Sequence, residues 1–292
     1  MASRPEYADL AANPQVRNII ELALAEDMAG DDLTSNCVIP AGIGASAALT
    51  AKAAGVLAGL GIFAAVFQKI DKHLRVECFF SDGSYVKPGD IIARVSGNAR
   101  NLLAAERVAL NFLCHLSGVA TQTARYVERM AGTSAVITDT RKTMPGMRLL
   151  EKYAVYCGGG CNHRLNLADG ILIKDNHLAA LTGRQSLRDT VVQARHDAPA
   201  GTVVEVEVSS LAQAEEAVAG GADIVLLDNM SAGQMAEVVK RLAGRVIFEA
   251  SGGINLSTVA AVAGSGVNRI SVGAITHSAD VLDFSLEMES KA

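Results

Sequence analysis

From Gly132 onward, short apolar runs alternate with amphipathic stretches, and this alternation restricts the possible folds more than any other feature of the chain. Six of the apolar runs have the length and composition of strands: residues 135–139, 171–174, 203–208, 224–227, 246–249 and 269–272. Amphipathic stretches such as 211–219 and 235–242 separate most of them and predict helices. Buried strands that alternate with helices pair in parallel, with the helices outside.

Six strand-helix units in about 140 residues are too few for a standard eight-stranded barrel of roughly 250 residues. We therefore expect a six-stranded, incomplete α/β barrel, with a doubly wound open sheet as the alternative. Residues 45–97 have a different pattern, because short strands and turns predict an antiparallel unit there. Residues 101–130 then predict a helix that is interrupted around Ser117-Gly118.

Charge and cysteine content exclude several classes of protein. Twenty-six basic and 31 acidic residues give a net charge of −5, so we expect no nucleic-acid or membrane partner, since both require a concentrated basic surface. The N-terminal residues do not resemble a secretory signal, and we expect a cytoplasmic location. Five scattered cysteines are typical of reduced thiols, and Cys157, Cys161 and His163 lack the spacing of a zinc site.

Polar or charged residues follow each of the six predicted strands. The carboxyl ends of parallel strands in an α/β fold meet at one edge, where functional sites are built. Thr140 and five basic residues gather at this edge: Arg141 and Lys142 after the first strand, Lys174 after the second, and His163 and Arg164 in the loop before it. In a net acidic protein, these residues predict a site for a small ligand with several negative charges, because guanidinium groups bind carboxylate or phosphate with two hydrogen bonds.

Glycine turns follow the last two predicted strands and predict a phosphate subsite. The backbone N–H groups available there belong to Ser251, Gly252, Gly253, Ser271, Val272 and Gly273. Glu207 and Asp228 lie at neighbouring strand ends, where their oxygens can bind Mg²⁺ or accept hydrogen bonds from sugar hydroxyls. Salt bridges from these two carboxylates to Arg141 or Lys174 are the alternative.

Several of these stretches resemble the quinolinate phosphoribosyltransferase family, and the resemblance extends over almost the whole chain. The longest reads TDTRKTMPGMR over residues 138–148 and is followed by GGGCNHR at 158–164 and IKDNH at 173–177. Shorter matches are ERVALN at 106–111, EVEV at 205–208, LLDN at 226–229, EASGGI at 249–254 and SVG at 271–273. Departures such as Met144, Ser209, Ser210 and Met230 leave the charged positions unchanged.

The resemblance implies a fold, an assembly and a reaction. The expected domains are an N-terminal open-faced α/β sandwich with an interface helix (1–118), an α/β barrel (119–278) and a C-terminal segment (279–292) that packs on the N-terminal domain. The expected assembly is a homodimer with its sites at the subunit interface. The expected enzyme is a decarboxylating pentosyltransferase of NAD biosynthesis, which converts quinolinate and phosphoribosyl pyrophosphate to nicotinate mononucleotide, CO₂ and pyrophosphate with Mg²⁺.

The resemblance also implies a role for each site residue. The quinolinate carboxylates and the diphosphate would be bound by Arg107, Thr140, Arg141, Lys142, His163, Arg164 and Lys174. Glu207 and Asp228 would bind the ribose hydroxyls and Mg²⁺, largely through the substrate. Residues 251–253 and 271–273 would bind the 5′-phosphate. Lys142, Lys174, Glu207 and Asp228 are the residues expected to be catalytic.

Three other functions are less consistent with these residues. One is a related phosphoribosyltransferase that acts on another small acid, such as a paralogue associated with molybdate transport, but the intact pairs Arg141-Lys142 and His163-Arg164 favour the dicarboxylate. An aldolase that forms a Schiff base at Lys174 needs apolar surroundings, whereas Asp175 follows directly. A lipoyl or biotin carrier module at 82–95 needs a modified lysine at a hairpin tip, but Lys87-Pro88-Gly89 predicts a plain turn.

Overall fold

The computed structural model describes residue 7 and residues 10–181 and 183–289 of the 292-residue chain, which forms two compact units. The first unit comprises Met1–Ala124, Thr143–Gly159 and Ile275–Ala292, and the second comprises Arg125–Lys142 and Gly160–Ala274. This division is less continuous than the one expected at residue 118. Helix α4 (Ala99–Arg129) runs past that position, and Thr143–Gly159 belongs to the first unit although the chain around it belongs to the second.

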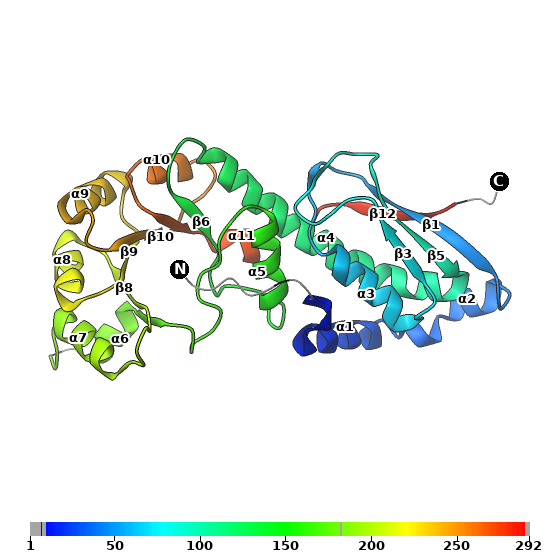
Figure 1. Ribbon diagram of the computed structural model, residues 1–292, viewed down its shortest axis with the longest axis horizontal. Helices are drawn as coiled ribbons and strands as arrows, with labels where there is room; N and C mark the ends of the chain where they lie inside the picture. Colours follow the sequence, from blue (N-terminus) through cyan, green and yellow to red (C-terminus); the bar gives the residue numbers. More distant parts are fainter. Residues whose placement is uncertain (1–6, 8–9, 182, 290–292) are drawn as a thin grey trace. The chain divides into compact units, whose positions relative to one another are not determined.

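The second unit is built on a six-stranded parallel sheet with the strand order β6-β11-β10-β9-β8-β7 (Figure 1). Its strands are β6 (Val136–Thr138), β7 (Ile171–Ile173), β8 (Val204–Val208), β9 (Ile224–Asp228), β10 (Ile247–Ser251) and β11 (Arg269–Ser271). The six predicted strands are all present, and every predicted boundary lies within two residues of the observed one.

The order of the strands decides between the two sheets that the sequence allows. From β8 to β11 each strand pairs with the one before it in the chain, and β6 pairs with β11. In a doubly wound sheet the order in which successive strands are added reverses at a switch point, whereas in this sheet it does not. The order is that of an α/β barrel that stays open between β6 and β7, because among the described residues these two strands form the edges. The prediction of a six-stranded, incomplete barrel is confirmed.

Helices cover the outside of this sheet in Figure 1. They are α6 (Asp175–Ala180), α7 (Leu187–Asp197), α8 (Leu211–Gly220), α9 (Ala232–Leu242) and α10 (Val259–Ala263). Serine side chains cap the N-termini of three of these helices. The hydroxyl oxygens of Ser186, Ser210 and Ser231 accept backbone N–H groups in the first turns of α7, α8 and α9. The amphipathic stretches therefore form the helices that the sequence predicts.

The strands are less uniformly apolar than a barrel wall usually is, and β8 shows this best. Its valines Val204, Val206 and Val208 are almost fully buried, and they alternate with Glu205 and Glu207. Successive side chains of a strand point to opposite faces, so the valines pack on one face and the glutamates lie on the other. The register places Glu207, Leu226, Glu249 and Arg269 side by side on four adjoining strands. Three of these four residues are charged, so the inner face of the barrel carries a row of charged groups.

The first unit contains a four-stranded antiparallel sheet with the order β12-β1-β5-β3. Its strands are β1 (Gly44–Ala51), β3 (Arg75–Cys78), β5 (Ile91–Asn98) and β12 (Phe284–Met288), and the short strands β2 (Gly55–Val56) and β4 (Tyr85–Val86) pair separately. The helices are α1 (Pro14–Glu26), α2 (Leu33–Val38), α3 (Leu60–Ile70), α5 (Arg148–Cys157) and most of α4, while α11 (Ala274–His277) begins at the unit boundary. The C-terminal segment thus ends as an edge strand beside β1.

Helix α4 is continuous, so the interruption predicted at Ser117-Gly118 is wrong. A Cβ atom at Gly118 would lie 2.1 Å from the carbonyl oxygen of Asp280, which shows that glycine permits a close approach of the C-terminal segment. The buried hydroxyl of Ser117 donates to the carbonyl oxygen of Ala58 at 3.2 Å. By length and composition α4 could cross a membrane, but Leu113 and Leu116 are fully buried, as in a core helix.

Candidate active site

The predicted site residues divide between the two units. Arg107 lies on α4 in the first unit with an exposed side chain, and all the others lie in the second unit at the carboxyl edge of the parallel sheet. The structure therefore brings the residues of the second unit to one edge, as the alternating pattern predicts. We call Arg141, Lys142, His163, Arg164 and Lys174 the basic group.

Glu207 and Asp228 form an acidic pair at this edge, and Glu207 faces Lys174 of the basic group. The Nζ atom of Lys174 lies 3.6 Å from Oε2 of Glu207, and 45% of the Lys174 side chain is exposed. Burial raises the pKa of Glu207, the charge of Lys174 counteracts this, and the negative charges of Asp228 and Asp175 raise the pKa further. Glu207 and Asp228 are thus close enough to repel each other, and a cation between them would relieve that repulsion.

Two arginines of the basic group have buried donors without a protein acceptor. Among the described residues, the Nε atoms of Arg141 and Arg164 have no hydrogen-bond partner, although Nη1 of Arg164 donates to the carbonyl oxygen of Gly170 at 3.1 Å. Burial lowers the pKa of Arg164, and the nearby charge of Arg141 lowers it further. Two close guanidinium groups with unused N–H donors are an unfavourable arrangement unless an anion binds between them. This pair is suited to a carboxylate or phosphate ligand.

The buried carboxylate of Asp139 determines where His163 and Arg164 lie. Asp139 directly follows β6, and its Oδ1 and Oδ2 accept the backbone N–H of His163 and the side-chain amide of Asn162, each at 2.8 Å. The backbone of Cys161 bridges to Thr138 of β6 in parallel, as an extra strand would. The segment with His163 and Arg164 is thereby fixed at the open edge of the barrel.

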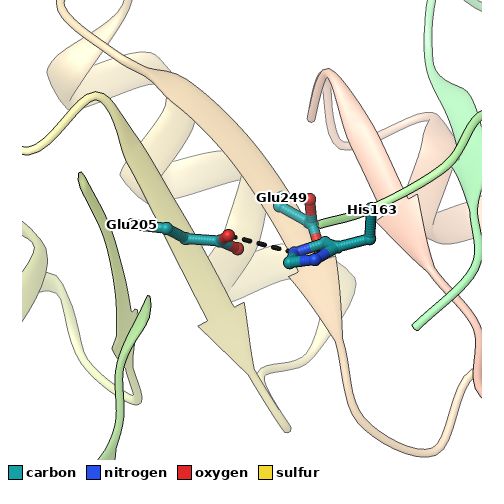
Figure 2. A group of neighbouring side chains, drawn as sticks. All are labelled: His163, Glu205 and Glu249. Atoms are coloured by element: carbon teal, nitrogen blue, oxygen red, sulfur yellow. Dashed lines mark ion pairs between the residues drawn. The ribbon is translucent and has the colours of Figure 1, made fainter. Parts of the chain in front are cut away.

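Figure 2 shows a buried cluster in which His163 lies between Glu205 of β8 and Glu249 of β10. The Nε2 atom of His163 is 3.0 Å from Oε2 of Glu205 and 3.4 Å from Oε1 of Glu249. The Nδ1 atom accepts the backbone N–H of Arg164 at 2.9 Å. Within the described part of the chain, Oε1 of Glu205 and both oxygens of Glu249 lack a hydrogen-bond partner. This cluster lies inside the barrel and connects directly to the basic group through His163.

The glycine turn after β10 has left-handed backbone, and the helices that follow the two predicted turns are short. Gly252 and Gly253 have positive φ values of 93° and 64°, and a Cβ atom at Gly252 would lie 2.3 Å from Oδ1 of Asn229. Helix α10 begins at Val259 and has five residues, and α11 has four residues after Gly273. A helix dipole therefore contributes little here, and an anion would have to be bound by the N–H groups of the turns themselves.

Three residues of this site were not assigned a role from the sequence: Asp139, Glu205 and Glu249. Each is followed or preceded by predicted site residues, and each has at most 4% of its surface exposed. The available signal was a charged residue within an apolar strand, as in Val-Glu-Val-Glu-Val, since buried carboxylates need partners. The partners themselves lie on other elements and have no local sequence signal.

The chain matches known proteins over nearly its entire length. The family model described as quinolinate phosphoribosyl transferase, N-terminal domain, matches residues 32–117, and the model for the C-terminal domain matches residues 119–287. Nicotinate-nucleotide pyrophosphorylase [carboxylating] of Mycobacterium leprae is 42% identical over 279 residues, which cover 93% of this chain and 96% of that protein. The probable enzyme of the same name from Bacillus subtilis is 39% identical and covers 94% and 93%.

Solved structures agree with these relatives. The crystal structure of NadC from Streptococcus pyogenes is 45% identical, with a TM-score of 0.89 and coverage of 94% of this chain and 95% of that one. The nicotinate-nucleotide pyrophosphorylase of Francisella tularensis is 37% identical, with a TM-score of 0.87 and coverage of 94% and 96%. The pyrophosphorylase of Pyrococcus furiosus, at 18% identity and a TM-score of 0.71, shares the fold.

Proposed function

Because the chain belongs to the quinolinate phosphoribosyltransferase family, we propose that this protein transfers the phosphoribosyl group of phosphoribosyl pyrophosphate to quinolinate. Quinolinate loses CO₂, and the products are nicotinate mononucleotide and pyrophosphate, an intermediate and a by-product of NAD biosynthesis. The observation that carries this proposal is that two arginines with unused buried donors share the site with the acidic residues Glu207 and Asp228. The two substrates together bring the groups that such residues bind, which are carboxylates, phosphates and sugar hydroxyls.

The first chemical step places charge where the basic group can stabilise it. Cleavage at ribose C1 leaves positive charge on the sugar and negative charge on the departing pyrophosphate. Lys142 is exposed, and its backbone N–H binds Oγ1 of Thr140, which holds this strand end in a fixed turn. Lys142 and Lys174 would donate to the leaving group, while the carboxylates of Glu207 and Asp228 hold the ribose hydroxyls.

The second step uses the electronic structure of the pyridine ring. The ring nitrogen attacks C1 of the ribose and becomes positively charged. The bond from ring carbon 2 to its carboxylate then breaks, CO₂ leaves, and the electron pair stays on the ring next to the cationic nitrogen until a proton replaces the carboxylate. Arg141 and Arg164, whose Nε atoms are buried, bind the quinolinate carboxylates in register, and poor solvation of the departing carboxylate favours its loss as CO₂.

Glu207 and Asp228 are the residues that fit Mg²⁺. Both offer carboxylate oxygens, the ligand type that this ion prefers, and their mutual repulsion favours a cation. Mg²⁺ commonly keeps several waters and binds through few protein ligands, so these residues and the substrate would share it. When bound, the ion would supply positive charge to neutralise the diphosphate.

The assembly and the location that we propose each follow from one feature of the chain. Arg107 is exposed on α4, away from the strand ends in the sequence, and we propose that it completes the site of a second subunit in a homodimer. All five cysteines are free, which is consistent with a reducing compartment, and we propose a cytoplasmic location. Transfer to another small acid is the alternative function, and relatives named for the carboxylating enzyme do not favour it.

The reaction can be tested directly. Purified protein is incubated with quinolinate labelled in its 2-carboxylate, phosphoribosyl pyrophosphate and Mg²⁺. We expect labelled CO₂ and nicotinate mononucleotide in equal amounts, and neither product when phosphoribosyl pyrophosphate is omitted. A protein that binds both substrates and forms neither product would contradict the proposed function. Transfer to another acid without release of CO₂ would support the alternative.

A further inference from the structure

Glu249 is a carboxyl group inside the barrel that the proposed chemistry does not use. It is fully buried, neither of its oxygens has a hydrogen-bond partner among the residues that the structure describes, and Oε1 lies 3.4 Å from Nε2 of His163. The same Nε2 atom lies closer, at 3.0 Å, to Oε2 of Glu205. Two buried carboxyl groups therefore approach a single ring nitrogen (Figure 2).

The Nδ1 atom of His163 determines whether this cluster is a metal site or a group of hydrogen-bonded side chains. Nδ1 of His163 accepts the backbone N–H of Arg164, so this atom carries a lone pair. In a neutral imidazole the proton then resides on Nε2, and Nε2 donates it to a carboxylate. The three ligand atoms lie within 4.8 Å of one another, as around a metal ion, but a metal needs the lone pair of Nε2. The tautomer therefore indicates a hydrogen-bonded cluster.

One N–H donor cannot satisfy two ionised carboxylates. The groups that face Glu249 are Glu205 from β8, His163 from the loop before β7, and Arg269 and Ser271 from β11, while the residue of β9 level with Glu249 is Leu226. Burial raises the pKa of Glu249 to about 7, the negative charge of Glu205 raises it as well, and His163, Ser271 and Arg269 lower it. Glu205 makes the shorter contact to His163, so Glu249 is the carboxyl group that needs a proton of its own.

We propose that Glu249 is a positioning residue that works as a neutral carboxylic acid. Together with Glu205, it holds the His163 ring, and the ring holds the backbone of Arg164 at the edge of the barrel. This inference rests on the proposed function only in naming quinolinate as the anion that Arg164 binds. Ionised Glu249 would add a negative charge behind the basic group, which weakens the binding of a dianion.

The test measures quinolinate binding by calorimetry from about pH 6 to about pH 9, with no turnover required. For the wild type, we expect the Kd to rise with pH above neutral, by up to about tenfold per pH unit. Glu249→Gln keeps the shape and the neutral state, so its Kd should stay near the acid-side value of the wild type across the range. Glu249→Ala should bind more weakly at every pH, because the ring loses a neighbour. Glu215→Gln, on the exposed face of α8, is the matched control and should keep the wild-type slope.

Two results would overturn the inference. One is a Glu249→Gln variant that keeps the wild-type pH slope; the other is a variant that binds as weakly as Glu249→Ala, which would show that the charge of Glu249 is needed. Infrared spectra of the wild type provide a second measurement that does not depend on the variant folding. The carbonyl stretch of a protonated, buried carboxyl group should be present at neutral pH and disappear as the pH rises. Absence of this band at neutral pH contradicts the inference, whereas its presence in a protein that binds no quinolinate contradicts only the proposed function.

Discussion

Oδ1 of Asp139 accepts the backbone N–H of His163 at 2.8 Å, although 24 positions separate the two residues in the chain. Asp139 directly follows β6 and is fully buried, while His163 belongs to the segment at the open edge of the barrel. The end of β6 carries Arg141 and Lys142, and the segment carries Arg164. One buried carboxylate thus connects the two parts of the chain that supply most of the basic group.

Asp139→Ala should damage both stability and ligand binding. The substitution leaves the buried N–H of His163 without an acceptor, which costs about 1–3 kcal/mol of unfolding free energy. The released segment should also weaken quinolinate binding. Asp139→Asn keeps one acceptor oxygen and should fall between the wild type and Asp139→Ala. Urea unfolding and calorimetric Kd values measure both effects, and an unchanged Kd in Asp139→Ala would show that the segment is held by other contacts.

Lys142→Ala and Lys174→Ala should lose activity with little change in stability. Both side chains are exposed at strand ends, and charge loss at exposed positions changes the unfolding free energy by about 0.5 kcal/mol or less. Loss of a donor to the leaving group should lower kcat/KM by at least about a hundredfold. Lys87→Ala, in an exposed turn of the first unit, is the control. Near-normal kcat/KM, or a Tm that collapses, would contradict the role given to either lysine.

Removal of divalent cations should abolish activity. Chelation should stop product formation, and added Mg²⁺ should restore it, because the diphosphate leaves with negative charge that the ion neutralises. Glu207→Gln and Asp228→Asn should raise the Mg²⁺ concentration needed for half-maximal rate. A titration of initial rate against Mg²⁺ measures this. Full activity in the presence of a chelator would exclude the predicted requirement for the metal.

Nicotinate should be a poor substrate in place of quinolinate. It has the ring nitrogen and one carboxylate, but it leaves part of the buried arginine pair without a partner, and unpaired buried donors are costly. The predicted ratio of kcat/KM values favours quinolinate by more than about a hundredfold. Comparable values for the two acids, measured with phosphoribosyl pyrophosphate and Mg²⁺, would identify a non-carboxylating enzyme instead.

Subunit mixing tests the proposed role of Arg107. Arg107→Ala and Lys174→Ala should each be nearly inactive alone. If Arg107 serves the partner's site, a mixed dimer has one site with both defects and one with neither. Random mixing makes half of the dimers mixed, so about a quarter of the wild-type activity should return. No recovery, with subunit exchange verified by mass spectrometry, would show that Arg107 acts within its own subunit or not at all.

The sequence predicted the elements of the barrel well because local patterns encode them. Short apolar runs between amphipathic stretches located all six strands of the parallel sheet within two residues. The polar residues that end these strands were predicted as the site, and the structure places those of the second unit at one edge. Ser117-Gly118 shows where local reasoning failed. A small, polar dipeptide predicts a helix break, but it occurs within α4 because Asp280 and Ala58 approach there, from segments far away in the chain.

The sequence by itself determined the alternation of strands and helices, the charged residues at the strand ends and the resemblance to one enzyme family. The tertiary structure decided that the sheet advances in one direction as an open barrel, and that Glu205, Glu249 and His163 meet inside it. These three residues lie on β8, on β10 and in the loop before β7, and no local pattern relates them. Their contacts at 3.0 and 3.4 Å depend on strand register and on the curvature of the sheet, which the packing of the whole unit sets.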